Sequence, residues 1–319
     1  TLNSDNATHT LYIIAAETIE VTNGCDLFSH YSNCTSIEGM KNLNTSNVTD
    51  MSWMFTNSSS LTDIDISMLD TSKVTTMEAM FYDCKAVKNI NIKGIDTSNV
   101  KYMGKSRKEA KGMFDGCISL TNIDITQLNM DSLVSTNAMF KNCSSLASID
   151  FSGRNLNAVT DMNSMFSGCS NATTINLSGT TTRDVTDLGD LFYNCSKLTD
   201  VDLSGFNTAK ATTVASLVNG CVVLKNIDLS AFDTSNVTNM KNMFRNCQQL
   251  VSLDLRNFDT SKSPEMNNFL LGDNALKILV LGPKVTNIIG DNFINNCGAL
   301  EAIIAQSTTS INFGDSNNY

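Results

Sequence analysis

The 319-residue chain is poor in several residue types that particular chemistries or membrane insertion require. Its two histidines leave little material for histidine-based catalysis or a histidine-rich metal site. The longest apolar candidate, Leu11 to Ala16, is far short of the roughly 18 residues of a membrane span. Acidic residues outnumber basic ones by 32 to 22, which opposes phosphate-driven binding. We therefore expect neither a membrane span nor a nucleic-acid partner.

Two prolines and 17 glycines exclude collagen-like and proline-rich disordered chains. The hydrophobic fraction of 41% is too high for a disordered protein. We therefore expect the chain to fold around a substantial core. Its length alone favours two domains. The sequence repeats itself almost from end to end, however, and this repetition favours one elongated array.

A cysteine recurs at a fixed interval and defines the repeat. Successive cysteines from Cys84 to Cys247 are 33, 26, 26, 26, 26 and 26 residues apart, and the long interval contains a seven-residue insertion. Ser58 and Asp273 fill the same slot where cysteine is missing, and cysteine returns near both ends. The sequence contains eleven such slots, which predicts about eleven turns.

Each repeat combines a strand motif, a polar linker and an apolar arm. One repeat reads LKNIDLSAFDTSNVTNMKNMFRNCQQ. Ile227 and Leu229 alternate with polar residues, which predicts a short strand with its aliphatic side chains facing inward. The DTSNVT linker supplies groups that cap and bend the chain. The spacing of Met240, Met243 and Phe244 predicts a short helix or a helical turn.

A repeat of this size cannot bury its own apolar side, so neighbouring repeats must stack. We expect an α/β repeat solenoid, right-handed and leucine-rich-repeat-like, with one parallel sheet face and short helices or turns on the other side. The predicted parts are an N-terminal cap at 1–36, an array at 37–273 with an insertion at 104–110, and a divergent C-terminal repeat and cap at 274–319.

The cysteines of the repeat are expected to be free thiols in the core, because serine and aspartate can replace them. Adjacent helical arms about 8–10 Å apart would also be too distant for disulfides, which need Cα separations below about 7 Å. Cys25 and Cys34 break the period within the N-terminal cap and form the one candidate disulfide. No CxxC motif supports a zinc cluster. We expect no cofactor and no essential metal.

Polar residues occupy the outward positions of the predicted strands. Parallel strands stack about 4.8 Å apart, so these residues should form a stripe rich in carboxylates. Three interpretations are open: a solvated, hydrogen-bonded ladder, a face that binds a protein or a glycan, and a calcium site. The candidate ligand-binding residues of this stripe are Asp63, Asp65, Asp124, Asp150, Asp200, Asp202, Asp228 and Asp254.

The insertion offers a second candidate surface of opposite charge. Its segment KYMGKSRKEAK holds five of the 22 basic residues. Insertions in solenoids bulge from one face, often a functional one, although a solvated loop is the alternative. The candidate binding residues here are Lys105, Arg107 and Lys108. Trp53, the only tryptophan, is either an anchor for a partner or a packing residue at the edge of the core.

The motif LxxIDLSxFDTSNVTxMxxMFxxC resembles the BspA-like leucine-rich-repeat surface proteins of bacteria and their relatives in some archaea and protists. The resemblance covers roughly residues 37–305, and the strand, the linker and the MFxxC arm recur together in phase. It implies an extracellular or cell-surface location, adhesion or host-protein binding, and no enzymatic activity.

These observations predict a non-enzymatic, adhesin-like binding protein, cell-surface or secreted, that presents a solenoid face to a macromolecular ligand. Its partner would be a surface protein or glycan of a host or a neighbouring cell. The alternative is a structural subunit of an extracellular filament or surface layer that associates with itself through solenoid ends or flanks. The sequence has no glycine-rich phosphate loop and no GxSxG elbow, and scattered aspartates alone do not define an acid/base pair.

Overall fold

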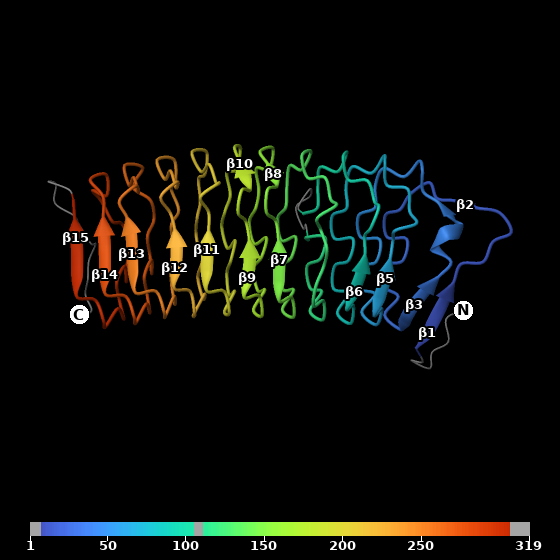
Figure 1. The fold of residues 1–319 in the computed structure, drawn as a ribbon, viewed down its shortest axis with the longest axis horizontal. Coiled ribbons are helices and arrows are strands. Elements are labelled where there is room, and N and C mark those ends of the chain that lie inside the picture. The colour runs from blue at the N-terminus through green and yellow to red at the C-terminus, as the bar shows by residue number, and fades with distance from the viewer. Residues whose placement is uncertain (1–7, 105–110, 307–319) are drawn as a thin grey trace. The chain divides into compact units, whose positions relative to one another are not determined.

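The computed structural model describes residues 8–104 and 111–306. The chain divides into two compact units, Thr1–Asp150 and Phe151–Tyr319. Each unit is a stack of parallel-strand turns, coloured from blue to green in the first unit and from green to red in the second (Figure 1). The repeat continues in phase through residue 150, so the sequence pattern does not mark this division.

The first unit contains short strands and, among its described residues, one 3-10 turn, η1 (Met40–Asn42). Parallel pairs join β1 with β3, β2 with β4, and β5 with β6. The strands are β1 (His9–Tyr12), β2 (Ile19–Glu20), β3 (Cys34–Glu38), β4 (Leu43–Asn44), β5 (Asp63–Asp65), β6 (Asn89–Asn91) and β7 (Ser148–Asp150).

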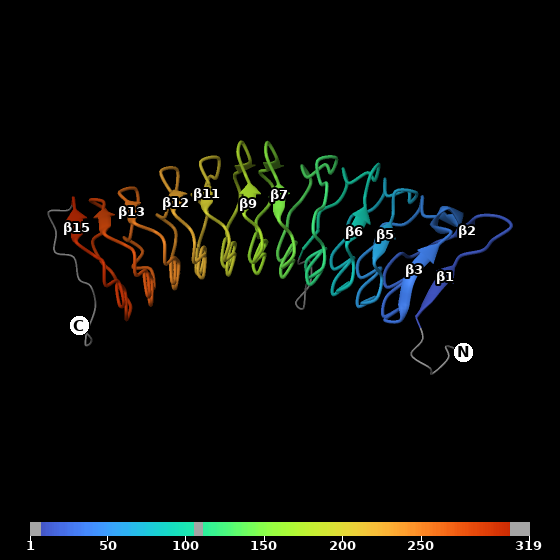
Figure 2. The same cartoon turned by 60° about the horizontal axis from the view of Figure 1, so that its bottom comes forward.

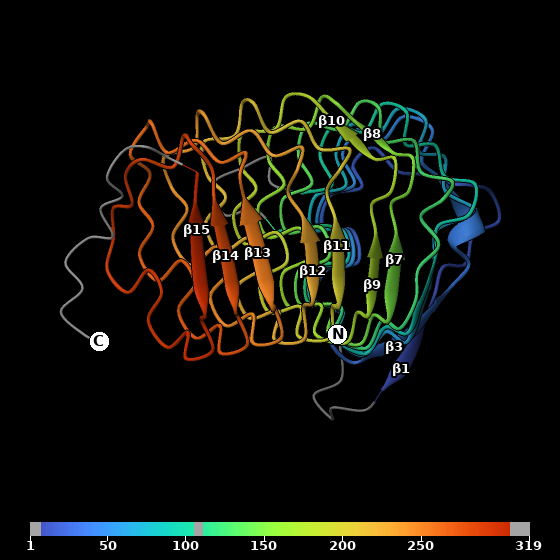
Figure 3. The ribbon, with the colours of Figure 1, turned by 60° about the vertical axis from the view of Figure 1, so that its left-hand side comes forward.

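The second unit continues the same architecture with longer strands toward its C-terminal end. Parallel pairs join β8 with β10 and β11 with β12, and β13, β14 and β15 form a three-stranded sheet (Figure 3). The strands are β8 (Asn155–Leu156), β9 (Thr174–Asn176), β10 (Thr181–Thr182), β11 (Asp200–Asp202), β12 (Asn226–Asp228), β13 (Ser252–Leu255), β14 (Ile278–Leu281) and β15 (Ala302–Ala305).

The returning arm of each turn is built from tight turns, and the helices expected for it are not confirmed in the described part of the chain. Trp53 N donates to Glu78 O at 2.9 Å, and Phe55 N donates to Met80 O at 2.8 Å, so alternate amides bond to the next turn. Thr56 N instead closes a turn on Trp53 O at 3.0 Å. The arm therefore pairs with its neighbour as a strand does while it bends on itself, and Figure 2 shows such arms stacked in succession.

Left-handed residues recur twice in most arms and prevent a helix from forming. Ala79 (φ 54°) and Asp83 (φ 55°) lie four residues apart, and Asn242 (φ 55°) and Asn246 (φ 61°) repeat the arrangement. A left-handed residue other than glycine costs roughly 1–2 kcal/mol, and an α-helix would need consecutive right-handed residues. Asparagine, aspartate and glycine tolerate this conformation best, which explains their use directly before the cysteine slot.

Phenylalanine rings stack through the core of the first unit. The ring centroids of Phe55 and Phe81 are 5.5 Å apart, and those of Phe81 and Phe114 are 5.4 Å apart, with both interplanar angles at 11°. Phe28 and Phe140 extend the stack at its two ends. Stacked aromatic pairs contribute about 0.5–1.5 kcal/mol beyond the burial of their area. The ring stack therefore contributes to the cohesion between turns.

Cysteine occupies its slot in the repeat because its thiol donates a hydrogen bond inside the core. The buried Cys195 Sγ lies 3.1 Å from Phe166 O in the preceding turn. Ser58 makes the equivalent bond to Phe28 O at 2.7 Å, so a hydroxyl can replace the thiol in this slot. The thiols of the repeat are free and buried, as predicted. Burial raises the pKa of Cys221 to about 12.

Asp273 places a carboxyl group in the same slot. The side chain is fully buried, and its Oδ1 accepts a hydrogen bond from Cys247 N at 2.7 Å. Its Oδ2 has no hydrogen-bond partner among the described residues. Desolvation raises the pKa of Asp273 to about 9, so the folded chain holds this group protonated at neutral pH.

The DTSNVT linker joins neighbouring turns through its threonine hydroxyl. Thr208 Oγ1 donates to Asp233 O at 2.9 Å and accepts from Asp233 N at 2.8 Å. The Asp233 carboxylate accepts from Ser235 N at 2.9 Å, and hydrogen bonds from the Ser235 side chain and backbone lower the pKa of Asp233. The recurring linker of the repeat therefore ties neighbouring turns together.

Candidate functional site

The outward side of the strands carries two polar rows that define the candidate site. Residues on either side of each buried central residue point outward, as Asp200 and Asp202 do around Val201. The first outer row is Asp63, Asn89, Asn122 and Ser148 in the first unit and Thr174, Asp200, Asn226 and Ser252 in the second. The second outer row is Asp65, Asn91, Asp124 and Asp150 in the first unit and Asn176, Asp202, Asp228 and Asp254 in the second. All eight predicted aspartates are exposed.

The aspartates of the first outer row are bonded across neighbouring strands. Asn89 Nδ2 donates to Asp63 Oδ1 at 2.7 Å, and Asn226 Nδ2 donates to Asp200 Oδ1 at 2.8 Å. The bonds from Asn89 and Thr62 hold the pKa of Asp63 below its ordinary value. These carboxylates therefore remain charged without any bound cation.

The aspartates of the second outer row cap the ends of their strands. Ser204 N donates to Asp202 Oδ1 at 2.9 Å, and Ser230 N donates to Asp228 Oδ1 at 2.8 Å. Hydrogen bonds from the Ser230 side chain and backbone lower the pKa of Asp228. Each of these carboxylates keeps lone pairs on its exposed side while the backbone bond fixes its position. The row is therefore a preorganised array of negative charge.

One aspartate of the second outer row carries its own counter-charge. Arg256 Nε donates to Asp254 Oδ2 at 2.9 Å, and Arg256 Nη2 also pairs with this oxygen. Hydrogen bonds from Arg256 lower the pKa of Asp254. Arg256 thus balances the negative charge of Asp254, whereas the described ion pairs include no basic partner for Asp202 or Asp228.

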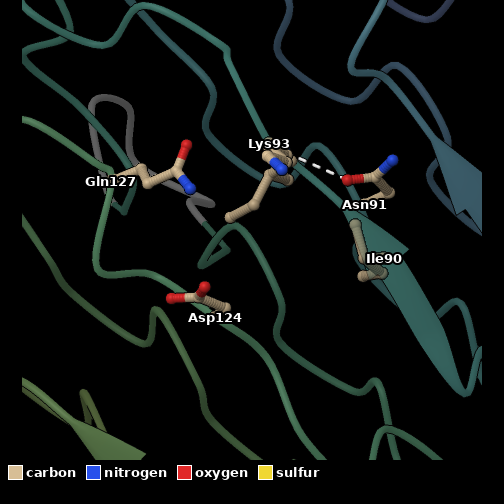
Figure 4. Close-up of a pocket in the computed structure, with 6 residues that line it drawn as sticks. Ile90, Asn91, Lys93, Asp124 and Gln127 are labelled. Atoms are coloured by element: carbon tan, nitrogen blue, oxygen red, sulfur yellow. Dashed lines mark hydrogen bonds between the residues drawn. The ribbon is translucent and has the colours of Figure 1, made fainter.

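A hollow of about 180 Å³ opens on this face beside Asp124. Figure 4 shows the side chains of Lys93, Asp124 and Gln127 around the opening, with Lys93 N hydrogen-bonded to Asn91 Oδ1 at 3.1 Å. The hollow has room for one side chain of a partner, and it presents both signs of charge. Its walls are Ile90, Asn91, Ile92, Lys93, Asp124 and Gln127.

The insertion residues Lys105, Arg107 and Lys108 lie outside the described residues. Trp53 is half-buried in the arm with φ at 62°, and its ring meets Tyr82 edge-on at 6.2 Å between centroids. Lys111 Nζ lies 5.3 Å from the centroid of the same Tyr82 ring. Trp53 thus packs against an aromatic neighbour at the rim of the core.

Cys25 and Cys34 are both free thiols, and each has partners of its own. Cys34 Sγ donates to Ser36 O at 3.1 Å, and Ser52 Oγ donates to Cys25 Sγ at 3.6 Å. Within the described ranges, no group of three or more histidine, cysteine, aspartate or glutamate residues is arranged to hold a metal ion.

The regular repeat did not reveal that both outer rows lose their polarity at the C-terminal end. Ile278 and Val280 on β14 occupy the two outward positions that aspartate, asparagine, serine or threonine fill in the earlier turns, and Ala302 and Ile304 follow on β15. The alternation within LKILVLG contains this signal, because its third and fifth residues are aliphatic.

Two family descriptions match the sequence. Residues 97–215 match the BspA type leucine rich repeat region (6 copies). Residues 22–111 and 160–278 match the family described as Mycoplasma protein of unknown function, DUF285. The parallel-strand turns and these matches define a BspA-like leucine-rich-repeat solenoid protein. The chain belongs to the DUF285 family, whose matches cover more than half of it.

Solved structures with a similar chain path include a leucine rich cell surface protein from Faecalibacterium prausnitzii. Its sequence identity to this chain is 19%, the match covers 97% of this chain and 93% of that chain, and the TM-score is 0.42. A leucine-rich repeat protein from Bacteroides ovatus has 17% identity, with coverage of 82% and 64% and a TM-score of 0.44. The functional domain of InlJ from Listeria monocytogenes, which includes a cysteine ladder, has 14% identity, with coverage of 84% and 50% and a TM-score of 0.30.

No curated protein sequence matches the chain. The described residues include no helix with the length and hydrophobicity that crossing a bilayer requires.

Proposed function

We propose that the chain is a non-enzymatic, cell-surface or secreted binding protein that presents its strand face to a macromolecular ligand. The observation that carries this proposal is the pair of outer rows, whose carboxylates are exposed and fixed by hydrogen bonds such as those to Asp200 and Asp228. Groups that are already ordered lose little side-chain entropy when a partner binds. The partner would be a surface protein or a glycan of a host or a neighbouring cell.

The charge of the rows suits recognition of a basic partner. Asp200, Asp202 and Asp228 are exposed on the adjacent strands β11 and β12, which pair in register. Fixed charges of one sign steer an oppositely charged partner toward the surface and set the register of docking. The carboxylates would therefore contribute to the association rate as well as to affinity.

The protonation states of the rows favour binding over catalysis. Hydrogen bonds to Asn226 and Thr199 lower the pKa of Asp200, whereas a general acid at neutral pH needs a raised pKa. Desolvation raises the pKa of Asp115 to about 6 and that of Asp273 to about 9, and both side chains are buried. The carboxyl groups with raised pKa are thus separate from the exposed rows.

Reversal of the acidic rows tests this proposal. An array of glycans and matrix proteins first selects a ligand of the wild-type chain. The triple variant Asp200→Lys, Asp202→Lys and Asp228→Lys should then bind that ligand about tenfold or more weakly and with a smaller salt dependence, because the attractive charges become repulsive. Exposed substitutions usually change stability by less than about 0.5 kcal/mol each, so the melting curve should remain close to that of the wild type.

A matched control separates local from overall charge. The triple variant Glu20→Lys, Asp131→Lys and Asp291→Lys makes the same change in net charge at exposed positions outside the outer rows. It should retain most of the affinity. Equal losses in both variants, or unchanged binding by the strand-face variant with a normal melting curve, would rule out the central strand face as the binding surface.

A further inference from the structure

The strand face changes from acidic to apolar over the last turns of the second unit. The register of β13, β14 and β15 pairs Ser252 with Ile278 and Asp254 with Val280, and in turn pairs Ile278 with Ala302 and Val280 with Ile304. Both outer rows therefore become aliphatic at the same turn. We call this surface the apolar patch, and its residues are Ile278, Val280, Ala302 and Ile304.

The side chains of the apolar patch are accessible to a partner. Ile278 is 40% exposed and Ile304 is 48% exposed. Adjacent parallel strands lie about 4.8 Å apart, so these side chains form a continuous surface. The inward residues Leu279 and Leu281 remain buried in the core. The outward aliphatic residues are therefore not needed to fill the core, and contiguous exposed apolar groups mark interaction surfaces.

Charge is distributed unevenly around the apolar patch. On the side of β11 and β12, Asp200, Asp202 and Asp228 provide acidic groups without a salt bridge among the described ion pairs. Beside the patch, Lys277 Nζ lies 3.1 Å from Glu301 Oε1, so these two charges offset each other. The strand face of this unit thus presents an acidic half followed by an uncharged, aliphatic half, in the order in which Figure 3 shows β11 to β15.

We propose that this composite surface binds an extended peptide segment with a basic half and an aliphatic half, lying across the strands of the second unit. The proposal rests on the binding function proposed above and identifies the chemistry of its partner. Basic side chains would meet Asp200, Asp202 and Asp228, and aliphatic side chains would pack on Ile278 and Val280. Four strand spacings of about 4.8 Å correspond to roughly six residues of extended peptide at about 3.3 Å each.

Fluorescence anisotropy with defined peptides tests the proposal on the full chain. The probe is a fluorescein-labelled octapeptide of four lysines followed by four valines. Two matched probes replace the valines with serines or the lysines with glutamates. The lysine–valine peptide should bind at least about tenfold more tightly than either matched probe, because only it satisfies both halves of the surface.

Two variants assign the binding to the apolar patch. The double variant Ile278→Asn and Val280→Asp installs the residue types that the outer rows carry in earlier turns, so it should fold normally. It should lower the affinity for the lysine–valine peptide to that for the lysine–serine peptide. The control Met68→Asn removes another exposed aliphatic side chain, 67% exposed and off the outer rows, and should leave the affinity unchanged.

The outcomes separate this proposal from the function on which it rests. Equal binding of the lysine–valine and lysine–serine peptides, or no peptide binding, would overturn the apolar half of the site. The acidic rows would still be supported if the lysine triple variant lost the array-selected ligand. A wild-type dimer that becomes a monomer in the Ile278→Asn and Val280→Asp variant, measured by light scattering, would instead show that a second copy covers the patch and would also overturn the proposal.

Discussion

Asp273→Asn is expected to raise the free energy of unfolding by about 4 kcal/mol at pH 7. The folded chain keeps this buried carboxyl protonated with its pKa raised to about 9, whereas the unfolded chain ionises it near its ordinary value of 3.8. A raised pKa of this kind leaves stability intact below the unfolded value and removes it as the pH rises toward the folded value. Asparagine can still accept the bond from Cys247 N and does not ionise.

Denaturant titrations between pH 4 and pH 8 measure this effect. Wild type and Asp273→Asn should have similar stability near pH 4, and the wild type should weaken progressively as the pH rises. Asp228→Asn is the matched control, because hydrogen bonds from Ser230 lower the pKa of Asp228 and should make this substitution slightly destabilising at pH 7. A difference between wild type and Asp273→Asn that does not vary with pH would show that Asp273 is not held protonated.

Phe81→Ala is expected to lower the free energy of unfolding of the first unit by about 3–5 kcal/mol. Phe81 is fully buried and stacks between Phe55 and Phe114, so truncation leaves a cavity with ring faces on both sides. Chemical denaturation followed by circular dichroism measures the loss. Met68→Ala, at a side chain that is 67% exposed, is the control and should change stability by less than about 0.5 kcal/mol. Similar losses of stability in the two variants would contradict a stabilising role of the Phe81 ring in the stack.

The strands and the inward aliphatic residues were predictable because alternation in the sequence reflects a physical period of two residues. The conformation of the returning arm was not predictable, because the spacing of Met240, Met243 and Phe244 fits either a helix or two successive turns. The distinction depends on the left-handed conformations of Asn242 and Asn246. Asparagine, aspartate or glycine directly before the cysteine slot is a sequence signal for these turns, and its recurrence argues against a helix.

The sequence predicted that the aspartates of the candidate site face outward, but it did not predict the hydrogen bonds that fix them or the apolar residues that follow them. Alternation placed Asp200 and Asp228 outward, but the hydrogen bonds that fix them depend on contacts between turns and on backbone geometry. The apolar patch was not predicted, because the acidic pattern ends at Asp254, although Ile278 and Val280 continue the rows in phase. The repeat thus predicts whether a side chain lies inward or outward, and departures from the repeat indicate where the polarity of the surface changes.

Carboxyl footprinting of the ligand complex tests most directly whether the strand face is the recognition surface. Carbodiimide-driven coupling of glycine ethyl ester, followed by mass spectrometry, reports the accessibility of individual carboxylates in the free and bound chain. We expect the ligand to reduce strongly the labelling of Asp200, Asp202 and Asp228 and to leave that of Asp131 and Asp291 unchanged. Undiminished labelling of the three strand-face aspartates in a saturated complex would contradict it.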